Sequence, residues 1–197
     1  MKVVCLASGG IDSSVLMLML KRMGHEVFPL HINYGQKAAM MEQKSFHKTC
    51  EFLQIKPEII DISNIGKLSI GLTKSDLSYN DSPFFPARNF LLLTIATIYA
   101  NAKSIKVISI GALSNSVFPD QTKEFMKSAE ATLNIAIQEQ IKILTPLIDL
   151  NKREVVEMAR KYNFPLEITY SCYIGSPNPC GKCMSCKERE AVEKIQT

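Results

Sequence analysis

Short apolar runs and longer amphipathic segments alternate along the first 165 residues of this chain. The apolar runs have the length of buried strands and lie near residues 2–7, 26–32, 57–62, 106–110 and 141–144. The segments between them repeat apolar residues every three to four positions, as helices do, near residues 12–23, 39–53, 88–101, 121–137 and 151–161. Strands that alternate with helices at this spacing predict an α/β fold. We expect a mostly parallel five-stranded sheet covered on both faces, which is a three-layer α/β/α architecture.

The connections between these elements indicate how the chain is organised. Asn151 followed by Glu154 is a capping-box pattern that predicts a helix start. Residues 63–87 are rich in Ser, Asp, Gly and Pro and predict a long connection, which often forms a lid or a substrate loop. No linker interrupts the chain. We therefore expect residues 1–165 to form one domain and residues 166–197 to form a metal-binding segment packed on it.

Composition and charge narrow the class of protein. The chain has 197 residues, of which 46% are hydrophobic and 21% charged, as is typical of soluble globular proteins. Its net charge of +4 comes from 23 basic and 19 acidic residues that are dispersed, which permits an anionic ligand without requiring nucleic acid. No apolar run is long enough to cross a bilayer, and no leader pattern is visible. We expect a cytoplasmic protein with no membrane partner.

A glycine-containing loop follows the first predicted strand and opens the first predicted helix, at residues 8–13 (SGGIDS). Backbone N–H groups at a helix N-terminus bind anions, and the helix dipole favours negative charge there. Gly9 and Gly10 let the chain approach a ligand closely, and Ser8 and Ser13 can add hydroxyl donors. The loop lacks the lysine of a Walker motif. It predicts a phosphate site of another kind.

Four of the six cysteines lie close together near the C-terminus: Cys172, Cys180, Cys183 and Cys186. Two overlapping C-x2-C pairs supply three thiolates, and one more distant cysteine supplies the fourth, which fits one tetrahedral zinc ion. A closed four-thiolate site has no open coordination position, so this zinc would be structural. An iron–sulfur cluster and a metal-free redox pair are the alternatives.

Arg88 is a candidate ligand for an anion because it begins the predicted helix that follows Phe85-Pro86-Ala87. The start of that helix should lie near the carboxyl edge of the sheet, where ligands of open α/β sheets bind. A guanidinium there can hold phosphate or carboxylate with two hydrogen bonds. The alternative is an arginine on the solvated face of the first turn.

These motifs occur together and in a characteristic order. The SGGIDS loop, Tyr34-Gly35-Gln36, Pro86-Ala87-Arg88-Asn89 and the cysteine cluster resemble the 7-cyano-7-deazaguanine synthase (preQ0 synthase, QueC) family of the PP-loop ATP pyrophosphatase superfamily. The resemblance extends from residue 1 to about residue 190. It implies a Rossmann-like PP-loop (HUP-like) fold and a zinc-binding C-terminal segment.

The resemblance also implies an activity. Members of this family use ATP to convert 7-carboxy-7-deazaguanine and ammonia to 7-cyano-7-deazaguanine through adenylated intermediates, in queuosine biosynthesis. The chain would then be an ATP-dependent carbon–nitrogen ligase with ATP, Mg²⁺ and structural Zn²⁺ as its cofactors. Its partners would be small molecules and not nucleic acid, with a homodimer as the possible assembly.

Residue roles follow from the resemblance. The implied nucleotide-binding residues are Ala7, Ser8, Gly9, Gly10, Ile11, Asp12, Ser13, Ser14, Val15, Leu16, Met17, His31, Tyr34 and Gly111. The implied catalytic residues are Asp12, Ser13 and Arg88, and the implied substrate-binding residues are Arg88, Asn89 and Asp120. Asp12 would act through Mg²⁺ or by holding the loop. A partly buried imidazole at a strand end is the alternative reading of His31.

Three positions depart from the family pattern. Gln121 and Thr122 replace a Cys and an Arg next to Asp120, and Ala38 replaces a His after Tyr34-Gly35-Gln36. A diverged adenylating enzyme with another acid or acceptor is therefore one alternative function. A PP-loop tRNA-modifying enzyme is a second alternative. The sequence shows no basic stripe, which argues against it. A zinc-stabilised nucleotide-binding module without catalytic activity is a third alternative, and the intact SGGIDS loop argues against it.

Overall fold

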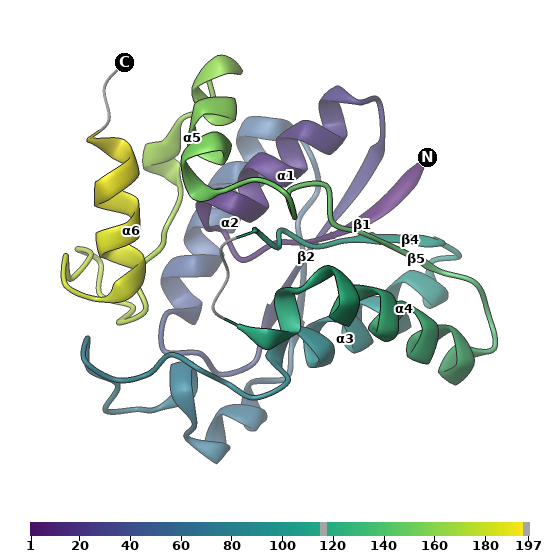
Figure 1. The fold of residues 1–197 in the computed structure, drawn as a ribbon, viewed down its shortest axis with the longest axis horizontal. Coiled ribbons are helices and arrows are strands. Elements are labelled where there is room, and N and C mark those ends of the chain that lie inside the picture. Colours follow the sequence, from purple (N-terminus) through teal and green to yellow (C-terminus); the bar gives the residue numbers. More distant parts are fainter. Residues whose placement is uncertain (115–117, 195–197) are drawn as a thin grey trace.

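The computed structural model describes residues 1–114 and 118–194. Within these residues the centre of the molecule is a sheet in which every pair of neighbouring strands is parallel, in the order β3-β2-β1-β4-β5 (Figure 1). The strands are β1 (Lys2–Leu6), β2 (Glu26–Asn33), β3 (Glu58–Asp61), β4 (Val107–Ser109) and β5 (Lys142–Leu144). The α-helices are α1 (Ile11–Arg22), α2 (Ala39–Leu53), α3 (Arg88–Ala102), α4 (Lys123–Ile137), α5 (Lys152–Lys161) and α6 (Met184–Glu193).

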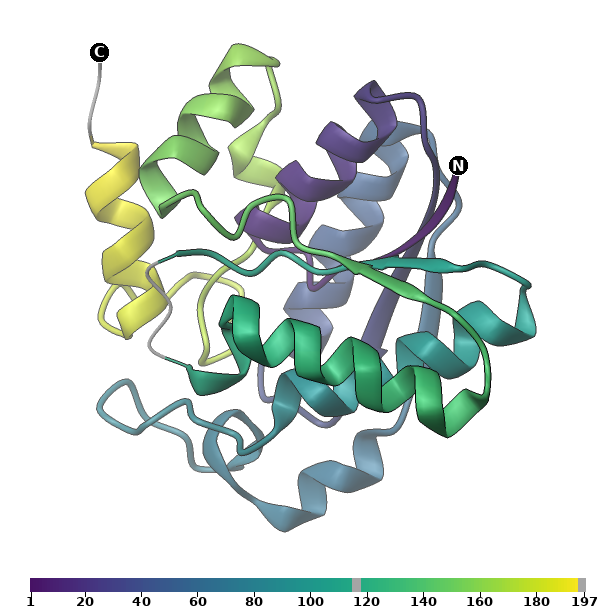
Figure 2. The same cartoon turned by 45° about the vertical axis from the view of Figure 1, so that its right-hand side comes forward.

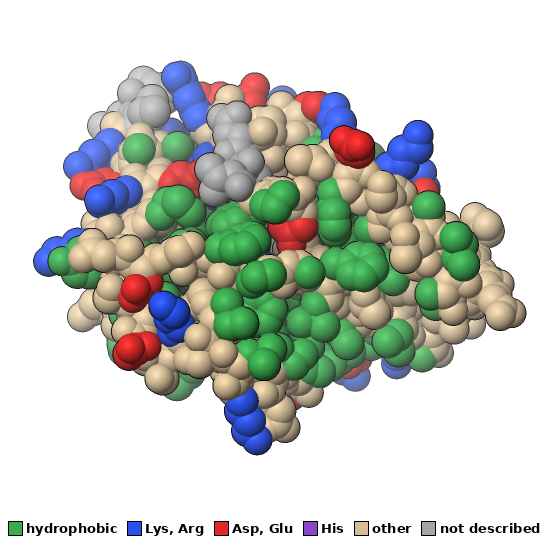
Figure 3. Space-filling view, turned by 60° about the horizontal axis from the view of Figure 1, so that its bottom comes forward, with side chains coloured by type: hydrophobic (Ala, Val, Ile, Leu, Met, Phe, Trp, Pro, Cys, Tyr) green, Lys and Arg blue, Asp and Glu red, His purple; other side chains and the backbone are tan. Residues whose placement is uncertain are grey.

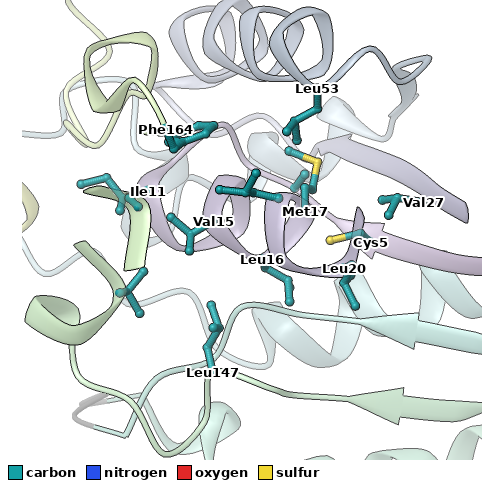
Figure 4. Close-up of a cluster of buried hydrophobic side chains, with 14 of the residues drawn as sticks. Cys5, Ile11, Val15, Leu16, Met17, Leu20, Val27, Leu53, Leu147 and Phe164 are labelled. Atoms are coloured by element: carbon teal, nitrogen blue, oxygen red, sulfur yellow. The ribbon is translucent and has the colours of Figure 1, made fainter. Parts of the chain in front are cut away.

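Alternate side chains of the strands point into two separate hydrophobic clusters, one on each face of the sheet. Val3 and Cys5 of β1 pack with apolar residues of α1, α2 and α5, and Figure 4 shows part of this cluster. Val4 and Leu6 point the other way and pack with apolar residues of α3 and α4. Figure 2 shows the two helical layers on opposite sides of the sheet. The three-layer α/β/α prediction is therefore confirmed.

The predicted elements are found within two residues of their expected bounds, and the sheet is parallel throughout. The predicted capping box is present: the backbone N–H of Asn151 donates to Glu154 Oε2 at 2.7 Å, and the N–H of Glu154 donates to Asn151 Oδ1 at 3.1 Å. Helix α6 was not predicted. Most of its residues are polar or charged, so its hydrophobic period is weak.

The connection between β3 and α3 contains two short 3₁₀ helices, η1 (Ser63–Leu68) and η2 (Gly71–Thr73). Leu68, Ile70 and Phe84 of this connection are large apolar side chains that remain exposed. Figure 3 shows the face that lies at the bottom of Figure 1, where hydrophobic side chains gather in the middle with few charged ones among them. None of the helices in the described residues combines the length and the apolar character that crossing a membrane requires.

The strand order determines where a ligand can bind. Strand β1 pairs with β2 on one side and with β4 on the other, so the chain leaves the central strands in opposite directions. Open α/β sheets bind their ligands outside the carboxyl ends of the strands at such a switch point. The SGGIDS loop follows β1 and lies at this point. The C-terminal segment approaches the same edge, where α6 packs beside α5 (Figure 1).

Candidate active site

A cavity of about 410 Å³ opens at the carboxyl ends of β1, β2 and β4. Its apolar wall comes from the carboxyl ends of the strands, with Leu6, Leu30, Ile32 and Ile110, and from Leu92 of α3. Its polar wall comes from the SGGIDS loop, the starts of α2, α3 and α5, and the C-terminal segment. The cavity therefore joins the phosphate-type loop to residues that are more than one hundred positions away in the sequence.

The loop itself has a backbone that requires glycine. Gly9 has φ of +80°, and a Cβ at this position would lie 2.4 Å from the carbonyl oxygen of Glu42 and 2.7 Å from the backbone nitrogen of Phe46. Gly10 is the N-cap of α1 and offers no side-chain capping bond. The first N–H groups of this twelve-residue helix therefore have no side-chain cap. They face the edge of the cavity, where an anion can accept hydrogen bonds from them.

The structure divides the predicted nucleotide-binding stretch in two. Ala7, Ser8, Gly10, Ile11, Asp12 and Ser13 line the cavity. In contrast, Ser14, Val15, Leu16 and Met17 are fully buried on the core side of α1, where Ser14 Oγ lies 3.2 Å from Thr49 Oγ1. The prediction treated the stretch as continuous, but these four residues lie farther along α1, where the helix is packed into the core, and none of them lines the cavity.

Asp12 is held by a residue that the sequence analysis did not single out. Lys152 Nζ, at the first position of α5, lies 2.5 Å from Asp12 Oδ2 and 3.6 Å from Glu188 Oε2 of α6. All three residues line the cavity. The other carboxylate oxygen, Asp12 Oδ1, is buried and has no hydrogen-bond partner within the described residues. A cation or a donor from a ligand can satisfy that oxygen.

Arg88 starts α3 and lines the cavity, so the alternative position on the solvated face is not the one that it adopts. Burial acts to lower the pKa of its guanidinium, but the neighbouring Tyr34 and Asp120 outweigh this effect and raise it. The Arg88 guanidinium also lies over the Phe118 ring, 5.4 Å from the centroid. A permanently charged, partly desolvated guanidinium of this kind suits a phosphate or carboxylate ligand.

Asn89 and Asp120 form a buried pair next to Arg88. The backbone N–H of Asn89 donates to Asp120 Oδ2 at 2.8 Å, and Asn89 Nδ2 donates to Asp120 Oδ1 at 3.0 Å. Asn89 lines the cavity, whereas Asp120 lies behind it and is 7% exposed. The carboxylate that was predicted to bind substrate therefore caps the start of α3 and orients Asn89.

A hydrogen-bonded chain leads from the turn after β2 to α2. The backbone N–H of Tyr34 donates to Gln36 Oε1 at 2.9 Å, and Gln36 Nε2 donates to Glu42 Oε2 at 2.7 Å. All three residues line the cavity. Burial raises the pKa of the Glu42 carboxyl, although the Gln36 hydrogen bond and the charge of Arg88 act to lower it. Of these residues only Tyr34 was predicted, because no local spacing pairs Gln36 with Glu42.

His31 lies on β2 beneath the loop. Its Nδ1 is 2.9 Å from the carbonyl oxygen of Ala7, and its ring stacks on Phe46 with a centroid distance of 5.5 Å. Burial lowers its pKa, while the bond to Ala7 acts to raise it. His31 lines the cavity, as Gly111 does, where a Cβ would lie 3.4 Å from the Asp12 backbone. The structure thus combines both readings of His31, a buried imidazole that also borders the cavity.

The four C-terminal cysteines converge. Their Sγ atoms all lie within 4.8 Å of one another, and four sulfurs around one zinc ion at about 2.3 Å would lie about 3.8 Å apart. The backbone N–H groups of Lys182 and Cys183 point at Cys180 Sγ, at 3.5 Å and 3.3 Å. Burial acts to raise the pKa of Cys180, but these donors outweigh it and lower the pKa to about 7. The cluster therefore fits a metal ion bound by thiolates.

The cysteine cluster is connected to the loop through Tyr170. The backbone N–H of Tyr170 donates to the carbonyl oxygen of Gly9 at 3.0 Å, and its hydroxyl donates to the carbonyl oxygen of Ser176 at 2.7 Å. Tyr170 also packs with Cys172, Cys183 and neighbouring residues in a third hydrophobic cluster. The C-terminal segment is thus part of the wall of the cavity.

Comparisons with known proteins identify relatives over nearly the whole chain. A family model described as "Queuosine biosynthesis protein QueC" matches residues 2–195. The 7-cyano-7-deazaguanine synthase of Campylobacter jejuni is 35% identical over 211 residues, which cover 98% of this chain and 94% of that protein. The 7-cyano-7-deazaguanine synthase of Methanobrevibacter smithii is 32% identical and covers 98% of this chain and 93% of that protein.

A solved structure supports the fold independently. The U34-tRNA thiolase NcsA from Methanococcus maripaludis, whose structure includes a [4Fe-4S] cluster, covers 99% of this chain and 73% of that chain with a TM-score of 0.53 and 16% identity. At that identity the likeness concerns the fold alone. The match to the family model and the sequence identity to the curated relatives show the family as well as the fold. On both grounds this chain belongs to the QueC family of queuosine biosynthesis proteins.

Proposed function

We propose that this chain converts 7-carboxy-7-deazaguanine and ammonia to 7-cyano-7-deazaguanine at the expense of ATP. One observation carries the proposal: an uncapped SGGIDS loop and the Arg88 guanidinium open into the same cavity. A phosphate-binding loop alone would suit any nucleotide-binding protein. A cationic side chain that faces the same cavity as the phosphate-binding loop suits a reaction that joins a nucleotide to an acidic substrate. Such a reaction can lead to the product for which the curated relatives are named.

The chemistry requires two activations because a carboxylate has no good leaving group. In the first, a carboxylate oxygen attacks the α-phosphorus of ATP, forming an acyl adenylate and releasing pyrophosphate. Ammonia then attacks the acyl carbon, and AMP leaves with that oxygen to give the amide. In the second, the amide oxygen attacks another ATP, pyrophosphate leaves, and the adenylated intermediate loses AMP and both protons of its nitrogen to form the nitrile. Each carboxylate oxygen thus departs in one AMP.

The residues around the cavity supply positioning and charge. The N–H groups of the loop would hold the β- and γ-phosphates, and Ser8 and Ser13 would add hydroxyl donors. Lys152, next to Asp12, would neutralise charge that develops near the α-phosphate. Arg88 would hold the substrate carboxylate, with Asn89 oriented beside it by Asp120. Holding two reactants in a reactive geometry can lower the activation free energy by roughly 7–11 kcal/mol.

Two metal ions belong to the proposal. Zinc would bind Cys172, Cys180, Cys183 and Cys186 and keep the C-terminal segment folded. Magnesium would bind the ATP phosphates together with the unpartnered Asp12 Oδ1, a donor set of the kind that Mg²⁺ prefers. We also propose a cytoplasmic location, because free thiolates and ATP require a reducing, ATP-containing compartment. The exposed apolar side chains near η1 and η2 support the proposed homodimer.

The decisive experiment is a reaction with ATP, Mg²⁺, ammonium and 7-carboxy-7-deazaguanine that carries ¹⁸O in its carboxyl group. We expect the nitrile and two AMP per nitrile, each with one ¹⁸O, measured by mass spectrometry. AMP with no nitrile would instead indicate a diverged acceptor. AMP that forms only with tRNA and a sulfur donor would indicate a thiolase. Absence of AMP under all conditions would leave a nucleotide-binding module.

A further inference from the structure

Glu42 is the acidic residue of the cavity that remains unpaired. Three acidic side chains line the cavity within the described residues, and Lys152 lies within 4 Å of two of them, Asp12 and Glu188. Glu42 instead accepts one hydrogen bond, from Gln36 Nε2 to its Oε2. In the described part of the chain its Oε1 has no hydrogen bond. The side chain therefore keeps free acceptor capacity directed at the cavity.

The direction of the Glu42 carboxylate is fixed by its neighbours. Gln36 is 4% exposed, and its Oε1 accepts the backbone N–H of Tyr34, so its NH₂ group must face Glu42. The main chain of Glu42 is fixed as well, because its carbonyl lies against Gly9 of the loop. A carboxylate that is held from both ends in this way has the preorganisation expected of a recognition group.

A negative charge at this position needs a reason. The proposed ligands, ATP and a carboxylic acid, are both anions, and an unpaired carboxylate would repel them. It stabilises the binding of a ligand that presents N–H donors to it. Adenine presents one donor beside an acceptor nitrogen on its corresponding edge. The 2-amino-4-oxopyrimidine edge of a deazaguanine presents two adjacent donors, the ring N–H and the amino group, which matches a carboxylate.

We propose that Glu42 binds the ring N–H and the 2-amino group of the deazaguanine acid and thereby selects it from acids that lack the amino group. This inference rests on the proposed function. Adenine has a separate and suitable place, the apolar wall at the ends of β1, β2 and β4. Burial raises the pKa of the Glu42 carboxyl, and the charge of the nearby Arg88 opposes that rise; Arg88 also lines the cavity and can hold the substrate carboxylate. Arg88 would then bind the carboxylate of the substrate, and Glu42 would bind the N–H donors on its pyrimidine ring.

The test pairs a change in the protein with a change in the ligand. AMP release would be measured for the wild type and E42Q with 7-carboxy-7-deazaguanine and with its analogue that lacks the 2-amino group. Glu51 is exposed on the same helix, so E51Q is the matched control. A hydrogen bond to a charged group is worth about a tenfold to hundredfold preference. We expect wild type and E51Q to prefer the amino compound by about 100-fold in kcat/KM, and E42Q by less than about tenfold.

Other results would overturn the inference. If E42Q lowered kcat/KM equally for both acids, Glu42 would not contact the amino group. If E42Q raised only the KM for ATP, Glu42 would contact the adenine of ATP and not the acid. If the wild type released no AMP with either acid, the proposed function would fail, and calorimetric binding of the same two acids would decide the role of Glu42. Equal affinities of the wild type for the two acids would then refute it.

Discussion

The contact between Lys152 and Asp12 offers a quantitative test of how the loop is built. Lys152→Met removes the Nζ atom that lies 2.5 Å from Asp12 Oδ2 and keeps most of the apolar stem. Two unit charges about 3 Å apart attract by roughly 5 kcal/mol at an effective dielectric constant of about 20. Loss of hydration cancels most of this energy. With the side chains 17% and 26% exposed, we expect a net coupling of about 1–2 kcal/mol.

The assay is a double-mutant cycle on the free energy of unfolding in urea. Each of Asp12→Asn and Lys152→Met should lower that free energy, and the double variant should lose less than the sum by the coupling energy. Lys48→Met, at an exposed position of α2, is the control and should change it by less than about 0.5 kcal/mol. Additive effects, within about 0.3 kcal/mol, would refute the structural role of the ion pair.

Three further predictions concern the loop, the metal and the substrate. Gly9→Ala should abolish ATP binding and lower the melting temperature, because the added Cβ would collide with the Glu42 carbonyl oxygen. Gly24→Ala is the control for backbone strain: Gly24 has φ of +79°, but an added Cβ would have no atom within 4 Å, so this variant should keep ATP binding. Cys183→Ser should reduce bound metal, measured by elemental mass spectrometry, well below one ion per chain and lower the melting temperature, and full occupancy would contradict the ligand assignment. Arg88→Lys keeps the charge but loses the planar pair of donors, so kcat/KM for the acid should fall by about 10- to 100-fold; an unchanged value would exclude a bidentate contact.

The sequence was informative where one short segment determines the structure. The strands and helices of residues 1–165 were predicted because each carries its own periodicity, and the loop was predicted because strand, glycines and helix are consecutive. Helix α6 was missed for a physical reason. Its buried positions include Cys186 and Val192, and Cys186 was assigned only as a metal ligand. A residue that serves both packing and metal binding weakens the hydrophobic signal of its helix.

The rest of the candidate site depends on contacts between distant segments. Lys152 and Asp12 are 140 positions apart, and only the sheet order brings the start of α5 to the start of α1. Asp120 illustrates the same dependence. Its motif predicts a substrate contact, and the tertiary structure adds a second contact, because its carboxylate accepts the backbone N–H of Asn89 at the start of α3, 31 positions earlier in the chain.

The structure also limits what the departures from the family pattern can mean for substrate choice. Thr122 caps α4 by accepting the backbone N–H of Phe125 at 3.1 Å, so its role is local. Ala38 is buried against the C-terminal segment, where a Cβ on Gly175 would lie 3.0 Å from the Ala38 Cα, and it does not line the cavity. Gln121 lines the cavity. Of the three departures, only Gln121 can therefore alter the acid or the acceptor directly, and a diverged substrate would have to be selected there while the loop, Arg88 and Glu42 keep their places.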